Sequence, residues 1–358
     1  MPDRLVETLF EFVSIPSESG NEEGFLRHIG AMFAGEFRAR CARDPYGNLV
    51  ASIPARNSAA SEALLLGFHA DTVAPGVGIK PRLDGDVVRS DGTTVLGADD
   101  KAGLAELVEA LRRAERFPPL EVVVTREEER GLLGSRNLDF SLLTARKGYV
   151  LDMDALESVV IGGPTKINLD VAVTGRAAHA GMEPEKGVSA IRAAAVAIAE
   201  IPDGRIDEFT TSNVGVIRGG ENRNSVPERV EVQIEARSLD HGRCVALADS
   251  IRRSFEKAAA AMGAVATVKV STAYRASAIG EGEEVAQIAS AALRAVGIEP
   301  RLRRIVGGTD ASAYNEHGIA CAVLGTGVFR EHTKDEYASV ADMRRAVEVI
   351  LELFRRFA

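Results

Sequence analysis

Residues 63–71 read Ala-Leu-Leu-Leu-Gly-Phe-His-Ala-Asp, so a short apolar run leads directly into an imidazole and a carboxylate. The run, Ala63 to Phe68, has the length and composition of a buried β-strand. Similar runs alternate with Ala/Leu-rich helical patterns in both outer parts of the chain, which indicates an α/β fold with a mostly parallel sheet. Sites in such sheets lie at the carboxyl ends of strands, where His69 and Asp71 stand.

The same reasoning predicts the other elements of this α/β domain. The predicted strands, besides 63–68, are residues 48–53, 120–125, 149–153, 303–306 and 319–324. The predicted helices are residues 22–37, 101–115, 284–296 and 342–357.

The segment between the two outer parts has its own order of elements, β-α-β-β-α-β, which matches the ferredoxin-like unit. Glycine and proline interrupt the pattern on both sides of the segment. We therefore predict one domain made of residues 1–163 and 275–358, with a second domain, residues 164–274, inserted into it. The expected elements of the inserted domain are strands 167–174, 213–218, 230–236 and 266–271, and helices 188–201 and 246–262.

The composition excludes several classes of protein. A chain of 358 residues is long enough for two domains. The net charge of −9 with no basic block argues against nucleic-acid binding. The amino terminus carries Asp3, Arg4 and Glu7 and no long apolar run, so we expect no secretory signal, no membrane span and a cytoplasmic location. The three cysteines have no CxxC spacing, which suits reduced thiols.

Further acidic or imidazole residues follow predicted strands or open a helix. Asp99 and Asp100 precede the helix at 101, the run Glu127–Glu129 follows the strand at 120–125, Asp152 ends a strand, and His332 lies in a late loop. Each has a structural alternative, because acids also cap helices or line solvated loops, and a lone histidine after a strand is usually structural. Their joint occurrence at strand ends predicts a metal site.

The residue types indicate which metal and how many ions. Imidazole and carboxylate ligands without thiolate suit zinc, with cobalt and manganese as alternatives. Two imidazoles and at least three carboxylates exceed the four ligands that one zinc ion ordinarily takes. We therefore predict two ions that share a bridging carboxylate and hold a hydroxide between them.

The segment Asp91–Gly103, Asp-Gly-Thr-Thr-Val-Leu-Gly-Ala-Asp-Asp-Lys-Ala-Gly, resembles peptidase T. Over its whole length the chain is similar to the dinuclear zinc peptidases that include peptidase T, carboxypeptidase G, aminoacylase and succinyl-diaminopimelate desuccinylase, with five motifs in the family's order. The resemblance implies a zinc-exopeptidase-like catalytic domain and an inserted lid and dimerisation domain, hence a homodimer. It also implies ligands for two zinc ions: His69 and Asp152 for one, Glu129 and His332 for the other, and Asp99 bridging both.

The resemblance assigns roles to other residues of the first domain. Asp71 would orient His69, Glu128 would be the general base, and the peptide bond after Asp99 is a candidate for the cis form. Peptidase T-like sequences usually carry Asp-Glu-Glu where this chain has Glu127–Glu129, so composition alone leaves open which acid is the base.

In the inserted domain, the motif around His179 resembles the segment whose histidine reaches the partner subunit's site and stabilises the oxyanion. The alternative is a loop histidine that bonds within its own domain. Asn224 and Arg237 match lid positions that contact substrate in relatives, and a guanidinium suits bidentate binding of a carboxylate. Arg237 could instead pair with Glu235 or Asp240.

The predicted reaction is metal-dependent hydrolysis of an amide bond in a small peptide. The bridging water loses a proton to Glu128 and attacks the carbonyl, and the same carboxyl returns the proton to the leaving nitrogen. The metals and His179 bear the oxyanion charge, and closure of the lid brings Arg237 to the substrate. One alternative is a deacylase or carboxypeptidase acting on N-acyl amino acids. A non-catalytic peptide-binding or assembly protein is another, which the presence of Glu128 beside the ligands disfavours.

Overall fold

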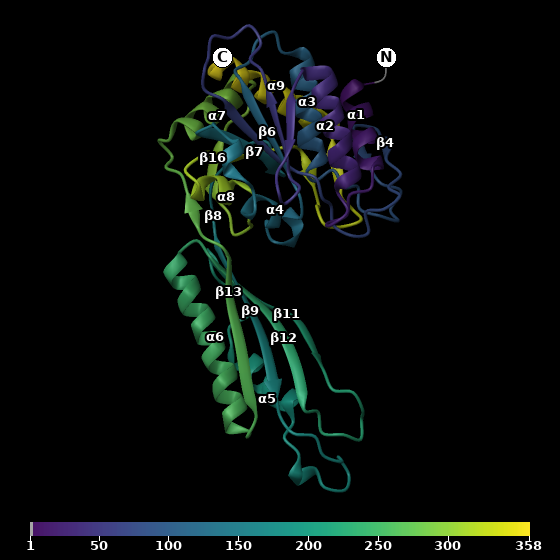
Figure 1. Cartoon of the computed structure of the whole chain (residues 1–358), viewed down its shortest axis with the longest axis vertical. Helices are drawn as coiled ribbons and strands as arrows, with labels where there is room; N and C mark the ends of the chain where they lie inside the picture. The colour runs from purple at the N-terminus through teal and green to yellow at the C-terminus, as the bar shows by residue number, and fades with distance from the viewer. Residues whose placement is uncertain (1–2) are drawn as a thin grey trace. The chain divides into compact units, whose positions relative to one another are not determined.

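The computed structural model describes residues 3–358, which form two compact units (Figure 1). The first unit runs through Gly162 and continues over Ala278–Arg304 and Gly308–Ala358. The second unit comprises Gly163–Ser277 together with Ile305–Gly307.

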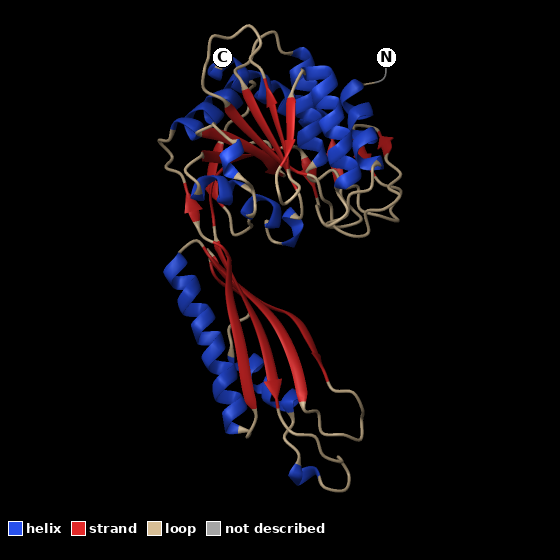
Figure 2. Ribbon diagram, in the orientation of Figure 1, coloured by secondary structure: helices blue, strands red, loops and turns tan. Residues whose placement is uncertain are grey.

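A large mixed sheet forms the core of the first unit, with helices packed against it (Figure 2). Its strand order is β1-β2-β6-β3-β7-β16-β8-β14, with β15 beside β8, and the four neighbours β6, β3, β7 and β16 are parallel. The predicted α/β class with a mostly parallel sheet is confirmed. The bounds are β1 Arg40–Arg43, β2 Leu49–Ile53, β3 Leu64–His69, β6 Leu120–Thr125, β7 Lys147–Met153, β8 Ser158–Gly163, β14 Ser277–Ala278, β15 Arg301–Arg304 and β16 Ala320–Gly325.

Three helices of the first unit, α1, α4 and α8, are absent from the predicted set, and α1 is the longest of them. The apolar side chains of α1 recur at helical spacing, so Leu5, Leu9 and Phe12 are buried, and Asp3 caps the first turn of α1 by accepting from the Leu5 amide. The helices of this unit are α1 Arg4–Ser14, α2 Glu23–Phe37, α3 Lys101–Arg113, α4 Leu133–Arg136, α7 Glu284–Ala295, α8 Ala311–Glu316 and α9 Val340–Phe357, with 3₁₀ turns η1 Glu128–Arg130 and η2 Phe140–Leu142.

A second, smaller sheet of the first unit carries a loop that matters for the site. Its order is β17-β18-β5-β4, and residues 330–336 connect its antiparallel neighbours β17 and β18. Pairing of Ala338 with Val88 fixes β18 to β5. The bounds are β4 Arg82–Asp84, β5 Val87–Arg89, β17 Val328–Phe329 and β18 Tyr337–Ser339.

The second unit is an antiparallel sheet with two helices. Its order is β10-β11-β12-β9-β13, so β11, β12, β9 and β13 have the ferredoxin-like arrangement, as predicted, and β10 adds an edge strand. Alternate residues of β9, such as Leu169 and Val171, are buried in a core shared with both helices. The bounds are β9 Thr165–Thr174, η3 Pro184–Lys186, α5 Ala190–Glu200, β10 Gly204–Asp207, β11 Thr210–Gly219, β12 Arg229–Ser238, α6 His241–Ala261 and β13 Val265–Tyr274.

Across residues 3–358, the structure contains no helix with the length and apolar character needed to cross a bilayer.

Candidate metal centre

Three adjacent parallel strands bring the predicted ligands to one edge of the large sheet. His69 is the last residue of β3, Asp152 lies near the end of β7, and β6 ends at Thr125, shortly before Glu129. Because β6, β3 and β7 are parallel neighbours, their carboxyl ends lie side by side. Loops supply the two remaining residues of the group, Asp99 and His332.

These side chains form two clusters that share Asp99. In one cluster, His69 Nε2 lies 3.3 Å from Asp99 Oδ1 and 3.7 Å from Asp152 Oδ1. In the other, His332 Nε2 lies 3.3 Å from Asp99 Oδ2 and 2.9 Å from Glu129 Oε1. Different oxygens of one carboxylate thus face different histidines, which is the arrangement expected of a bridging ligand.

The donor sets fit divalent ions. Ligands arranged tetrahedrally at zinc's usual distances of about 2.0–2.1 Å are about 3.3 Å apart, close to the observed spacings. In each cluster the donor atoms all lie within 4.8 Å of one another. One imidazole and two carboxylates in each cluster suit zinc or a similar divalent ion.

The electrostatics of the clusters reflect buried charge. Burial raises the pKa of Asp152 to about 8, although a hydrogen bond from His69 opposes that shift. Burial would also raise the pKa of Asp99, but hydrogen bonds to His332 and His69 lower it far below its usual range. Hydrogen bonds to Asp99 and Glu129 raise the pKa of His332 to about 11. A divalent cation among these groups would offset the cost of burying several carboxylates together.

Asp71 contacts His69 through a different atom from the one expected. His69 Nδ1 lies 2.9 Å from the main-chain oxygen of Asp71 and 3.5 Å from its carboxylate. The carboxylate instead accepts from the Ser19 hydroxyl at 2.7 Å and from the amides of Glu128 and Glu129 at 2.9 and 3.2 Å. Asp71 therefore contacts the imidazole with its main chain, and its side chain holds the turn that carries Glu128 and Glu129, here called the glutamate turn.

The glutamate turn places two neighbouring carboxylates in different surroundings. Glu129 points to His332, whereas Glu128 belongs to neither cluster and is 9 % exposed. Burial raises the pKa of Glu128 well above its usual range, and repulsion from Asp152 adds to this effect. A buried carboxyl that lies outside both ligand clusters is available to take up and release a proton, as a general base must.

The peptide bond between Asp99 and Asp100 is cis, which confirms the prediction for this bond. Asp100 occupies the N-cap position of α3, but its side chain makes no hydrogen bond to the first turn. Its carboxylate is 2 % exposed and has no hydrogen-bond partner within residues 3–358.

His179 lies in the second unit on an exposed loop. Its Nδ1 accepts from the amides of Gly181 and Met182 at 3.2 and 3.1 Å. The amide of Ala180 donates to the main-chain oxygen of Asn224, so the loops carrying His179 and Asn224 are adjacent. Because Nδ1 is an acceptor, the neutral imidazole carries its proton on Nε2.

Arg237 already has a partner in the second unit. Its guanidinium binds Glu235 through two nitrogens, at 2.9 and 3.2 Å, and Nη1 donates to the main-chain oxygen of Val306 at 3.3 Å. Asp240, the other partner considered, caps α6 by accepting from the amide of Arg243.

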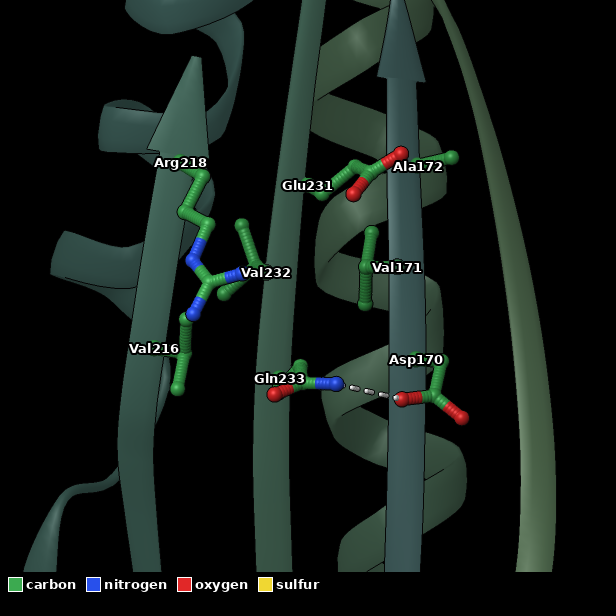
Figure 3. Close-up of a pocket in the computed structure, with 8 residues that line it drawn as sticks. All are labelled: Asp170, Val171, Ala172, Val216, Arg218, Glu231, Val232 and Gln233. Carbon is green, nitrogen blue, oxygen red and sulfur yellow. Dashed lines mark hydrogen bonds between the residues drawn. The ribbon is translucent and has the colours of Figure 1, made fainter.

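A cavity also lies over the second unit's sheet (Figure 3). Its polar side chains come from neighbouring strands, and Gln233 approaches Asp170 at 3.5 Å. It contains none of the predicted metal ligands. Its lining is Asp170, Val171, Ala172, Val216, Arg218, Glu231, Val232 and Gln233.

Comparison with known families identifies the class of protein. The family model described as "Peptidase dimerisation domain" matches residues 164–262, and that described as "Peptidase family M28" matches residues 48–186. Both models describe parts of peptidases, and the first covers most of the second unit.

Relatives that match the whole chain decide the family. An aminopeptidase PepT from Bacillus cereus is 35% identical with a TM-score of 0.87, and a tripeptidase from Staphylococcus aureus is 33% identical with a TM-score of 0.92. Each alignment covers 99% of this chain and 98% of the other. An uncharacterised protein of Bacillus subtilis, YqjE, is 35% identical over 99% of this chain and 98% of its own length. The chain belongs to the peptidase T-like M20 metallopeptidases, which hydrolyse peptides as metal-dependent exopeptidases.

Proposed function

We propose that this protein is a dinuclear zinc aminopeptidase that acts on small peptides. One observation carries the proposal: the two oxygens of Asp99 face two different histidine-containing clusters, and Glu128 lies beside these clusters as a member of neither. A carboxylate that can bridge two ions, next to a separate buried carboxyl that can act as a base, suits hydrolysis by two metal ions.

His69, Asp99 and Asp152 would hold one zinc ion, and Asp99, Glu129 and His332 the other. Two such ions lower the pKa of a bound water and polarise a carbonyl group. Cobalt and manganese can use the same donors, so the choice of zinc rests on ligand type and spacing.

Glu128 would carry the proton. Its carboxylate accepts a proton from the attacking water and then, as the acid, donates it to the nitrogen of the broken peptide bond. The Asp71 carboxylate would support this transfer, because it holds the amides of both Glu128 and Glu129 and so separates the base from the ligand.

His179 would act on the site of a partner subunit in a homodimer. Its Nδ1 accepts two main-chain amides, which leaves the Nε2 proton to donate to the substrate oxyanion. The match of the second unit to a peptidase dimerisation domain supports this assembly. Light scattering during gel filtration tests it, since a mass of one chain would contradict the dimer.

Asn224 and Arg237 would contact the peptide. The ion pair between Arg237 and Glu235 competes with a substrate carboxylate for the guanidinium, so binding would have to exchange one carboxylate for another. Arg237→Lys should raise KM more than it lowers kcat, because Lys keeps the charge and loses the bidentate geometry.

A substrate panel on zinc-loaded protein tests the proposed function. Tripeptides with a free amino group should be hydrolysed, their N-acetylated forms should not, and a chelator should abolish the reaction. Preference for N-acyl amino acids would indicate a deacylase instead. A protein that holds two ions and hydrolyses none of these compounds would be the non-catalytic alternative.

A further inference from the structure

The loop that carries His332 is the least enclosed part of the metal centre. The His332 side chain is 56 % exposed, compared with 2 % for His69. His332 and Arg330 both have left-handed backbone conformations, with φ of 62° and 58°, which residues with a Cβ rarely adopt. Something outside this loop must therefore hold it in register with Asp99 and Glu129.

Glu336, four residues after His332 and one before β18, makes that connection. Its Oε2 accepts from the Gly97 amide at 2.8 Å, and its Oε1 accepts from the amides of Ala98 and Asp99 at 2.7 and 3.1 Å. The side chain is 2 % exposed. One buried carboxylate thus receives three consecutive amides of the loop that ends at the shared ligand.

The rest of the His332 loop is tied to Glu336 by short-range bonds. The Glu336 amide donates to the main-chain oxygen of Thr333, and the Thr333 hydroxyl donates to the main-chain oxygen of Arg330. Stacking of Phe329 on Tyr337 closes the base of the loop. A shift of Glu336 would therefore move His332 relative to Asp99.

We propose that Glu336 is a positioning residue that sets the affinity of the cluster Asp99, Glu129 and His332 for its metal ion. This inference rests on the proposed dinuclear centre. Glu336 is not a member of the cluster. Through its bond to the Asp99 amide it fixes the separation of two ligands of the cluster, Asp99 and His332. Bonds from amides to a buried carboxylate are strong and directional, so the carboxylate defines this separation closely.

Glu336→Gln tests the inference because it keeps the size of the side chain and replaces one acceptor oxygen by an NH₂ group. That group faces amide donors, so at least one amide loses its acceptor. Asp335→Asn is the matched control, since it removes the same charge from an exposed position of the same loop.

The measurement is a competition titration of metal-free protein with zinc and a chelator, which yields a separate affinity for each of two ions. Wild type and Asp335→Asn should each bind two ions alike. Glu336→Gln should bind one ion 10- to 100-fold more weakly, which is the range typical of losing a residue that hydrogen-bonds a metal ligand. The affinity for the other ion should change less. Circular dichroism of the metal-free proteins should be unchanged.

The alternatives are separable. Two ions bound by Glu336→Gln with wild-type affinities would overturn the role of Glu336 alone. Wild-type protein that binds only one ion would overturn the dinuclear proposal and this inference with it. If Glu336→Gln is unfolded, Glu336→Asp, which keeps both acceptors on a shorter side chain, is titrated instead. If Glu336→Asp binds both ions with wild-type affinities, or also fails to fold, Glu336 has a structural role only and the inference is wrong.

Discussion

The two halves of the metal centre are built differently. His69 and Asp152 stand on neighbouring strands of the large sheet, in a buried environment. Glu129 lies in a 3₁₀ turn and His332 in an exposed hairpin loop, and Asp99, which both halves share, links them to the first half. We call these the strand half and the loop half.

The difference shows where positioning must come from. Strand geometry fixes the positions of His69 and Asp152, because hydrogen bonding in the sheet determines the spacing of neighbouring strands. The loop half depends on carboxylates that receive main-chain amides, with Asp71 holding the glutamate turn and Glu336 holding the Asp99 loop. We therefore expect the strand half to resist substitution of surrounding residues better than the loop half does.

The largest effect should follow from Asp99→Ala, which removes the ligand common to both halves. The affinity for both ions should fall by more than the roughly 100-fold that follows from losing a residue that only hydrogen-bonds a metal ligand. Peptide hydrolysis should fall to background. Metal analysis after gel filtration should approach no bound ion, against two for wild type. Retention of one tightly bound ion would show that the halves are independent.

Substitution within the glutamate turn should separate catalysis from metal binding. Glu128→Gln should keep both ions and thermal stability while kcat falls by about 10²–10⁴, because the proton carrier is lost. Glu129→Gln should instead weaken the ion of the loop half. Zinc stoichiometry and steady-state rates on the same samples distinguish the two. The opposite pattern would mean that base and ligand are assigned in the wrong order along Glu127–Glu129.

The histidines should differ in how much the metal-free fold depends on them. His69→Ala leaves buried carboxylates without their imidazole, so the free energy of unfolding should fall by about 3 kcal/mol. His332→Ala disrupts a half-exposed ion pair and should cost at most about 1 kcal/mol. Urea unfolding in the presence of a chelator measures both. Equal losses would remove the distinction between the halves.

The smallest effect on the metal centre should come from Glu106 in α3, the helix that follows Asp99. Glu106 is fully buried, both of its carboxylate oxygens lack hydrogen-bond partners in the described part of the chain, and burial raises its pKa well above the usual range. The Glu106 carboxyl therefore releases its proton at lower pH in the unfolded state than in the folded state. As pH rises above the pKa that Glu106 has in the unfolded state, the free energy of unfolding falls.

Glu106→Met should remove that loss. The variant should be more stable than wild type at neutral pH, and its advantage should grow from mildly acidic to neutral pH, because the wild-type carboxyl loses the stability that it contributes while protonated. Urea unfolding across this range measures the change, and zinc affinities should stay the same. A change in either zinc affinity would show that the stability of α3 also controls the site.

Much of the first unit could be predicted from local patterns. The run that ends in His69 and the strand that ends near Asp152 are apolar segments followed by polar residues, and the parallel sheet places such ends together. The helix α1 carries an equally clear periodicity, with Leu5, Leu9 and Phe12 on one face, although the predicted set omitted it. The cis bond after Asp99 followed from family resemblance and not from any local pattern.

Other features have no local signal. The two possible partners of Arg237, Glu235 and Asp240, are both close in sequence, and the structure selects Glu235 because Asp240 caps α6. The carboxylate of Asp71 lies 3.5 Å from the imidazole of His69, and it makes its shorter contacts with amides that lie 57 and 58 residues away. In both cases packing decides which of the available partners the side chain binds.

The sequence by itself determined the class of fold, the apolar strands and the residue types that can hold divalent ions, because these depend on side-chain chemistry and on periodicities within a few residues. Only the tertiary structure decided that each oxygen of Asp99 faces a different histidine, and that Glu336 binds amides 237 to 239 residues away. Those contacts depend on how distant loops pack against each other, and the geometry of a hydrogen bond is defined only once both of its partners are in place.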